Sequence, residues 1–369
     1  MAASRRPSFP VKTGSSWQIR SRLSSLSEKL ALHLAFVAGE LPRPLFRLFP
    51  PSGEPSRFPN CDNDLSLDDV VAKYRHAAPP AVDDDFFPVA RVYFGTAMMV
   101  ALAGGNFSSD GSTTWAHPVA DSAVGLNIPP LDEDLPIWRN YIGKLRALRN
   151  AEIPGVMLGL PDLIGPLDIA AGLLGPEQLC LDAMFEPEAV SSVLSECLRL
   201  WKEVFDVQVR ELGLAEGGMV TVFGNFMPGR ASLWSEDFSA LIGPETYRKF
   251  GLALDGELAA YLDSSIIHIH SSAGRCLPAI KDIEKLSVVE ISNDPNGPPL
   301  STILGWAAEI QAAGKSVMLS NWEHPLSDGD VDEILGKLDH RRLLVTLQCS
   351  SEAPAEAYRR KFLQLEKTN

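Results

Sequence analysis

Short apolar runs alternate with longer amphipathic segments from Phe86 onward, and this alternation constrains the fold more than any other feature of the sequence. Most of these runs are β-branched or apolar, and each is bounded by Gly, Pro, Asn or Ser. Such runs are typical of strands buried on both faces of a parallel sheet. The expected strands are Val89–Phe94, Gly155–Gly159, Met219–Gly224, Ser265–His270, Ser287–Ser292, Ser316–Ser320 and Leu343–Cys349.

The segments between these runs carry apolar residues at three- and four-residue spacing, which predicts amphipathic helices. The clearest is Glu188–Leu212, where the apolar residues form one continuous stripe. The other expected helices are Leu135–Leu148, Pro244–Leu262, Leu300–Ala313, Val331–Leu338 and Ala355–Leu365.

Strands that alternate with helices favour βαβ units and parallel pairing. A doubly wound sheet is one alternative, but it usually carries a glycine-rich phosphate loop after its first strand, and neither GxGxxG nor GxxxxGK[ST] is present. The favoured fold class is therefore α/β, a (β/α)8 TIM-like barrel with an irregular N-terminal extension. In such a barrel the active site lies at the carboxyl ends of the strands and in the loops that follow them.

The N-terminal part of the chain lacks this alternation. Residues 28–85 are interrupted by Pro and Gly and predict an irregular extension, with one helix from Ser24 to about Phe36. Residues 1–27 contain no acidic residue, and their Arg and Lys residues are scattered among serines. That composition fits either a disordered leader or an organelle transit peptide. The barrel is expected over residues 86–369, in the cytoplasm or, if the leader is a transit peptide, in an organelle.

Composition narrows the range of partners. The formal net charge of −14 over 369 residues argues against a nucleic-acid surface, which needs clustered Lys and Arg. The five cysteines form no CxxC pair, so neither a disulfide framework nor a zinc ribbon is indicated. Apolar stretches such as 93–105 are too short to span a membrane. A small-molecule substrate is therefore expected.

The sharpest local signal is the segment Ile266-Ile-His-Ile-His270. Alternation along a strand places His268 and His270 on one face, where two imidazoles can share a metal ion or a substrate. Cys349 ends the last expected strand, and two histidines with a thiolate form a good zinc site with one open position. The alternative is that the histidines are hydrogen-bonded pocket residues without a metal and that Cys349 is a small buried apolar residue.

Other candidate residues lie in loops. The stretch 224–245 is read as a long loop, and long loops in compact domains are usually functional. Within it, Asp237 is a candidate acid or base, or else the cap of a helical turn, while Asn225 and Arg230 are expected to orient the substrate. Asn293 follows a strand and is assigned the same role. Trp115 is expected to bind the substrate, and the neighbouring His117 is either part of a substrate lid or a hydrogen-bonded loop histidine.

Several segments together resemble the uroporphyrinogen decarboxylase superfamily. They occur in the family's order over roughly residues 86–365, and they are Asp162-Leu-Ile-Gly-Pro-Leu-Asp168, Phe185-Glu-Pro-Glu188, Ser235-Glu-Asp-Phe-Ser-Ala-Leu-Ile-Gly-Pro-Glu-Thr-Tyr247, His268-Ile-His270 and Gln348-Cys-Ser-Ser-Glu352. The resemblance implies a (β/α)8 barrel with a cleft at its carboxyl face. A homodimer is common among family members and is expected here.

The resemblance points to two activities. Cobalamin-dependent methyltransferases pass a methyl group between a corrinoid and a thiol at a His-x-Cys…Cys zinc site; here His268, His270 and Cys349 stand at those positions, with His270 in place of Cys. The corrinoid would sit on a partner protein. The alternative is decarboxylation of uroporphyrinogen or a related tetrapyrrole, with Asp237 aimed at the pyrrole nitrogens. The arginine-rich Met-Arg-Gln-Ala-Gly-Arg segment of those enzymes is absent, and Arg91 lies near the equivalent strand without its neighbours.

A reading from another class is a barrel that binds a small ligand without turning it over. Metal content distinguishes the two enzyme readings, and turnover distinguishes both from simple binding. The interpretation favoured from the sequence is zinc-assisted methyl transfer.

Overall fold

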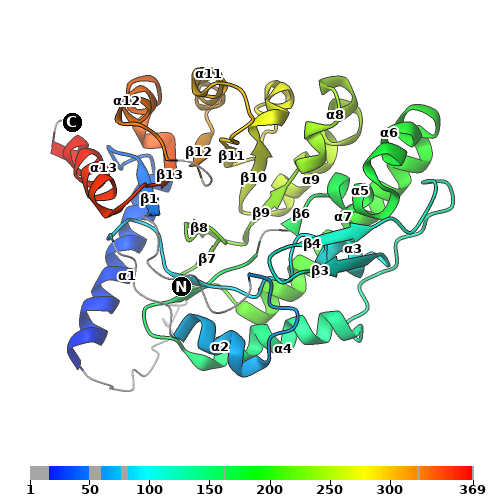
Figure 1. Ribbon diagram of the computed structural model, residues 1–369, viewed down its shortest axis with the longest axis horizontal. Helices are drawn as coiled ribbons and strands as arrows, with labels where there is room; N and C mark the ends of the chain where they lie inside the picture. The colour runs from blue at the N-terminus through cyan, green and yellow to red at the C-terminus, as the bar shows by residue number, and fades with distance from the viewer. Residues whose placement is uncertain (1–15, 50–59, 76–81, 162, 322–324, 368–369) are drawn as a thin grey trace, which may run out of the picture.

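The computed structural model describes residues 16–49, 60–75, 82–161, 163–321 and 325–367, and its centre is a seven-stranded parallel sheet (Figure 1). The strand order is β1-β13-β12-β11-β10-β9-β6, and every neighbouring pair is parallel. The strands are β1 (Leu45–Phe49), β6 (Leu163–Ile164), β9 (Ala231–Ser235), β10 (Ser264–His270), β11 (Val288–Ser292), β12 (Ser316–Asn321) and β13 (Leu343–Gln348). Because all seven run the same way, their carboxyl ends meet at one edge.

Shorter pairings lie beside this sheet. Strands β2 (Val89–Ala90) and β5 (Met157–Leu158) form a parallel pair, and a parallel bridge joins Gly159 to Val220 in β7 (Gly218–Val220). Two antiparallel hairpins are added by β7 with β8 (Phe226–Pro228) and by β3 (Asn106–Ser109) with β4 (Thr114–His117). Among the residues that the structure describes, strand pairing does not close into a barrel. A mixed α/β fold with a parallel sheet is confirmed, and closure is not.

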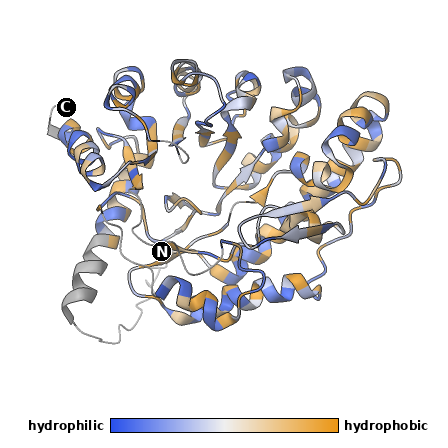
Figure 2. Ribbon diagram, viewed as in Figure 1, coloured by the Kyte–Doolittle hydropathy of each residue, from blue (hydrophilic) through white to orange (hydrophobic). Residues whose placement is uncertain are grey.

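Helices cover the sheet from outside, and Figure 1 shows α8, α11, α12 and α13 in an arc around the strands. The helices are α1 (Ser16–Val37), α2 (Leu67–Arg75), α3 (Met98–Leu102), α4 (Pro136–Ala151), α5 (Pro166–Leu174), α6 (Pro176–Phe185), α7 (Pro187–Leu212), α8 (Pro244–Phe250), α9 (Leu252–Tyr261), α10 (Leu277–Ile280), α11 (Leu300–Ala312), α12 (Asp328–Lys337) and α13 (Glu352–Gln364). The helices carry both hydrophobic and hydrophilic residues along their lengths (Figure 2). None of the described helices combines the length and apolar character that crossing a bilayer requires.

The core lies between the outer helices and the sheet. The long helix α7 buries Trp201 and Phe205 completely, and the Trp201 ring meets that of Trp234 on β9 edge to face at 6.5 Å. Strand β10 contributes Ile267 and Ile269, which are fully buried and alternate with the two histidines. The apolar face of β10 therefore packs into the core, and its polar face is left for chemistry.

Each of the seven expected strands is present, although those near residues 89, 157 and 219 are shorter than expected. Three strands of the central sheet were missed, and they are β1, β6 and β9. β1 lies in the segment expected to be irregular, because Arg47 interrupts its apolar run and prolines flank it. β9 lies within the stretch 224–245, which is therefore not one long loop. Helix α1 begins at Ser16, eight residues before its expected start, whereas residues 1–15 lie outside the described chain.

Candidate active site

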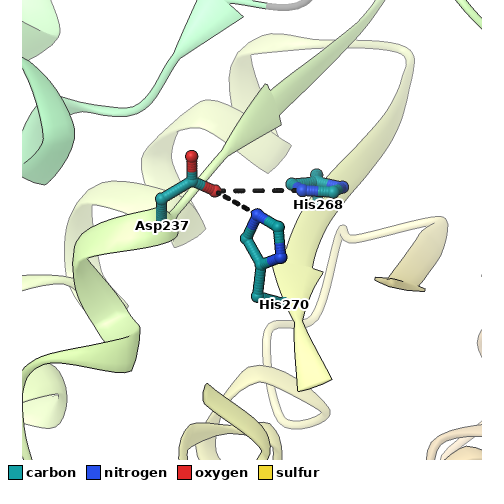
Figure 3. Close-up of side chains that lie close together, drawn as sticks. All are labelled: Asp237, His268 and His270. Carbon is teal, nitrogen blue, oxygen red and sulfur yellow. Dashed lines mark ion pairs between the residues drawn. The ribbon is translucent and has the colours of Figure 1, made fainter. Parts of the chain in front are cut away.

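Asp237, His268 and His270 come together at the carboxyl edge of the sheet, with one possible ligand atom from each lying within 4.8 Å of the others (Figure 3). Oδ1 of Asp237 is 3.8 Å from Nε2 of His268 and 3.6 Å from Nε2 of His270. The histidines end β10, and Asp237 opens the short 3-10 helix η1 (Asp237–Ala240) after β9. Neighbouring parallel strands thus deliver all three side chains to the same point.

A carboxylate from β11 or its following loop orients each imidazole. Nδ1 of His268 bonds Glu290, which pairs with it across the sheet, and Nδ1 of His270 is 2.8 Å from Oδ1 of Asp294. A proton on each Nδ1 satisfies these carboxylates and leaves the Nε2 lone pairs directed at Asp237. Burial works to raise the pKa of Asp294, but hydrogen bonds from His270 and Ser271 and the charge of His270 lower it overall.

Asp237 is fixed through its backbone. The Asp168 carboxylate in α5 accepts hydrogen bonds from the backbone nitrogens of Asp237, at 2.9 Å, and Phe238, at 2.6 Å. The Asp237 side chain is 46% exposed, yet its Oδ1 is buried and has no hydrogen-bond partner among the residues described. A buried carboxylate oxygen that faces two imidazole nitrogens is well placed to bind a cation.

A layer of buried acids lies beneath Asp237. Burial, followed by the charges of Asp255 and Asp168, holds the pKa of Glu236 well above its usual range. Burial also raises the pKa of Asp255 to about 6, against hydrogen bonds from Tyr247, Glu236 and Trp234. The pKa of Asp168 is likewise raised, by burial first and then by the charge of Asp237. These shifts favour the protonated acids and reduce the negative charge under the site.

The donor set suits a divalent metal ion. Two imidazole nitrogens and one carboxylate oxygen form a typical three-ligand set of catalytic zinc sites, which leave a further position for substrate or water. The carboxylates behind both imidazoles are the supporting partners that ligating histidines usually have. The residues present therefore fit zinc, with Asp237 as the third donor in this arrangement.

Cys349 is not part of this group. It follows β13, three strands from β10 in the sheet order, and it is 1% exposed. Its Sγ lies 3.6 Å from the carbonyl of Leu347, and burial raises its pKa to about 11. In this structure the thiol is a protonated group in the core, so its role as a zinc ligand stays a prediction. The sequence pattern predicts that Cys349 follows the last strand, as it does, but it does not predict how far that strand lies from β10 in the sheet.

Asn225 and Arg230 are not brought to the histidines. Asn225 is buried between β7 and β8, where its side chain bonds Thr221. Arg230 precedes β9, at the opposite end of that strand from Asp237. Its guanidinium pairs with Asp206 and lies over the rings of Phe205 and Tyr261. Strand β9 was not recognised in the sequence, and its full length separates Arg230 from Asp237.

Asn293 and Trp115 take different positions. Asn293 directly follows β11 at the carboxyl edge, and its side-chain nitrogen is 3.0 Å from Oδ1 of Asn321. Trp115 lies in β4 and is 49% exposed, while His117 on the same strand bonds Ser108 at 2.9 Å. Asn293 thus remains within the rim that holds the histidines, and Trp115 belongs to a separate hairpin packed against α5.

Sequence reasoning missed the role of Glu290 and Asp294 as the acids that support the histidines, although Asp294 is one of the polar residues at an expected strand end. Glu290 lies within the expected strand Ser287–Ser292 and Asp294 lies just after its end, and only the pairing of β10 with β11 shows that they meet His268 and His270. The available signal was an acid within an otherwise apolar run, since a charge buried in a strand needs a partner. Asp162 and Glu323, also at expected strand ends, lie outside the described residues.

Comparison with known proteins identifies a solved structure with a similar fold. The structure resembles a methyltransferase from Methanosarcina mazei with a TM-score of 0.57, over 90% of this chain and 93% of that one, at 11% identity. The chain shares its fold with a methyltransferase. This agrees with the methyltransferase branch to which the sequence segments point, and at this identity the likeness shows the fold alone.

The other comparisons add little. A HpcH/Hpal aldolase/citrate lyase family protein from Burkholderia cenocepacia J2315 aligns over 91% of this chain and 98% of its own, at 10% identity, but its TM-score of 0.32 supports no argument. Neither a protein-family model nor a curated protein matches the sequence.

Proposed function

We propose that this protein is a closed (β/α)8 barrel enzyme that transfers a methyl group between a corrinoid on a partner protein and a thiol or related small acceptor, with the help of zinc. The observation that carries the proposal is the group formed by Asp237, His268 and His270, whose donor atoms face one another while carboxylates hold both imidazoles from behind. The methyltransferase fold agrees with it.

The residues of the site would have separate roles in this reaction. The Nε2 atoms of His268 and His270 and Oδ1 of Asp237 would hold zinc, which when bound keeps a thiol acceptor in its nucleophilic thiolate form. Glu290 and Asp294 retain the protons on the Nδ1 atoms, so the imidazoles bind as neutral ligands. Asp168 fixes the position of Asp237, and Asn293 and Asn321 offer amide groups to the substrate at the same rim.

Decarboxylation of a tetrapyrrole is the second candidate, and one observation favours it. Asp237 is half-exposed at the rim and faces two histidines, so its carboxylate can contact the nitrogens of a pyrrole substrate directly. In this reading His268 and His270 act as hydrogen-bond donors and proton carriers. The absence of the family's arginine-rich segment weighs against it.

The deciding experiment is the metal content of purified, tag-free protein, measured by plasma mass spectrometry. We expect about one zinc per chain, with loss in His268→Ala and His270→Ala and retention in His340→Ala, a histidine outside the group. Asp237→Asn and Cys349→Ser, compared side by side, identify the third ligand. Protein without metal after growth in zinc would reject methyl transfer by this route. Two substrates are then tested, methylcobalamin together with thiol acceptors, and uroporphyrinogen. If the protein turns over neither of them, we would conclude that it binds a small ligand without reacting it.

A further inference from the structure

A second pocket lies at the carboxyl edge of the strands, away from the histidines. It has a volume of about 380 Å³ and combines two arginines with aromatic rings. Arg47 lies in β1, and Arg91 directly follows β2, the next strand along the chain. The lining residues are Arg47, Phe49, Asn60, Arg91, Tyr93, Val222 and Phe223.

The two arginines of this pocket form no ion pair among the described residues. The Arg47 guanidinium donates to the carbonyl of Phe223 and lies 4.5 Å from the centre of the Phe49 ring. The Arg91 guanidinium lies 4.8 Å from the centre of the Tyr93 ring. Within the described part of the chain, neither guanidinium forms an ion pair with a carboxylate. In a protein of net charge −14, two arginines in one pocket that pair with no described carboxylate favour the binding of an anion.

The two arginines also repel each other. Burial lowers the pKa of Arg47, the charge of Asp84 raises it, and the charge of Arg91 lowers it further. An anion between the guanidiniums would remove this repulsion and satisfy their free N–H groups. A planar guanidinium can bind an oxyanion through two parallel N–H groups.

The sheet register joins this pocket to the histidine group. Strand pairing from β1 through β13, β12 and β11 to β10 aligns one residue per strand in a row across the sheet. Residues aligned in this way in a parallel sheet point to the same face. The row consists of Arg47, Thr346, Ser320, Ser292 and His270. Arg47 and His270 are therefore the two ends of one polar row.

Buried polar atoms line the path between those ends. Oγ of Ser320, Oγ1 of Thr346, Oε1 of Gln348 and Oε1 of Glu290 are all buried, and none has a hydrogen-bond partner among the described residues. Gln348 pairs with Phe49 at the pocket, and Glu290 pairs with His268 at the other end. Ser320 and Thr346 belong to the row, and Gln348 and Glu290 lie two residues away on the same face. Unpaired buried polar groups cost free energy unless something bonds them, so this face is suited to bind a polar molecule.

We propose that Arg47 and Arg91 bind an oxyanion, a carboxylate, sulfonate or phosphate group, and that this group is the anionic end of a small-molecule substrate lying along the polar row toward His270. The identity of that molecule as the acceptor rests on the proposed function, whereas anion binding by the two arginines does not. The specificity of the enzyme would then be for an acidic substrate, set by a site that no family segment of the sequence contains.

Sulfate is the probe, because it presents the shared chemistry without a reacting group. Thermal unfolding of the full chain is followed over a series of sulfate concentrations, with ionic strength kept constant by chloride. We expect saturable stabilisation that Arg91→Gln weakens roughly tenfold in apparent Kd, since one charge-assisted contact is lost. Arg341→Gln, an exposed arginine elsewhere, should bind as the wild type does. Absence of sulfate-specific stabilisation, or an unchanged Arg91→Gln, would overturn the proposal.

Two further variants make the test complete. If Arg91→Gln does not fold, Arg91→Lys decides the same question, because an ammonium should bind sulfate more weakly than a planar guanidinium does. His268→Ala should keep sulfate binding while losing zinc. If wild-type protein holds no zinc but shows Arg91-dependent sulfate binding, the reaction proposal fails and the anion site stands; the reverse pattern rejects the anion site alone.

Discussion

The Asp168 carboxylate receives a hydrogen bond of 2.9 Å from the backbone nitrogen of Asp237, and so a residue of α5 determines where a residue after β9 points. A second bond, from the backbone nitrogen of Phe238, fixes the first turn of η1. Asp237 therefore reaches the two histidines as part of a rigid turn and not from a free loop. Its position depends on an acid that holds the turn by its backbone nitrogens.

Asp168→Ala should impair the site without unfolding the protein. Removing the acceptor frees the turn that carries Asp237, so we expect zinc affinity to fall by roughly 10- to 100-fold, as when the groups that support ligands are lost. Competition with a chelator measures the affinity. Asp182→Ala is the matched control, since Asp182 also accepts a backbone hydrogen bond, from Ala123, but far from the histidines. Equal losses in both variants would assign Asp168 a purely structural role.

Asp294→Asn should weaken metal binding through His270. The amide keeps the shape but not the negative charge that holds a proton on Nδ1, so the imidazole becomes a poorer ligand and zinc affinity should fall by about tenfold or more. Competition with a chelator measures the affinity in wild type and variant. An unchanged zinc affinity would contradict the assigned tautomer. Asp332→Asn, an exposed acid on α12, controls for surface charge.

His33 should make stability depend on pH. Burial first, then the charges of Lys29 and Arg43, lower its pKa to about 3, against a hydrogen bond to the Asp85 carbonyl. Below the unfolded value, 6.5, the unfolded chain binds a proton that the folded chain refuses. The free energy of unfolding should therefore fall as pH falls, by about 1.4 kcal/mol per pH unit from this residue.

Burial of Asp84 and Asp255 has the opposite effect on how the free energy of unfolding changes with pH. Their pKa values of about 6 mean that the folded chain keeps protons that the unfolded chain releases above pH 3.8, so they favour folding as pH falls. The His33 contribution is isolated by comparing wild type with His33→Gln in urea titrations. We expect the difference in unfolding free energy to shrink from pH 7 to pH 4.5; a constant difference would show that His33 titrates normally.

Two glycines should respond differently to a methyl group. A Cβ on Gly165 would meet Oε1 of Glu236 and lie 2.8 Å from the carbonyl of Ser235, so Gly165→Ala must displace the buried acids under Asp237. Gly256 in α9 has nothing within 4 Å of such a Cβ, and Gly256→Ala should stabilise the helix by roughly 0.5–1 kcal/mol. Thermal unfolding should show a lower midpoint for the first variant and a higher one for the second.

Local pattern was enough to place β10 and the histidines, because period-two alternation decides both the strand and the face. It was not enough for β1, whose Arg47 breaks the apolar run that a buried strand normally shows. The third member of the metal group was assigned to Cys349 from a family pattern. The structure places Asp237 beside the imidazoles, which depends on strand order and therefore on contacts distant in sequence.

The residues that connect the site are equally non-local. Glu290 can orient His268 because the two residues pair across neighbouring strands, and no spacing rule within a single segment predicts this contact. The same holds for Arg47 and His270, whose common row exists only once five strands are in register. Sequence reasoning found the reactive side chains and missed what orients them.

The pairing of β1 with β13 has a consequence for how the molecule is made. Leu45 aligns with Leu344, so the first strand of the sheet meets its neighbour about 300 residues later in the chain. At typical synthesis rates of roughly 5–20 residues per second, β1 emerges from the ribosome 15 to 60 seconds before its partner exists. During that interval an apolar strand with an open edge is exposed, which predicts a nascent chain that depends on chaperones until its last strand is released.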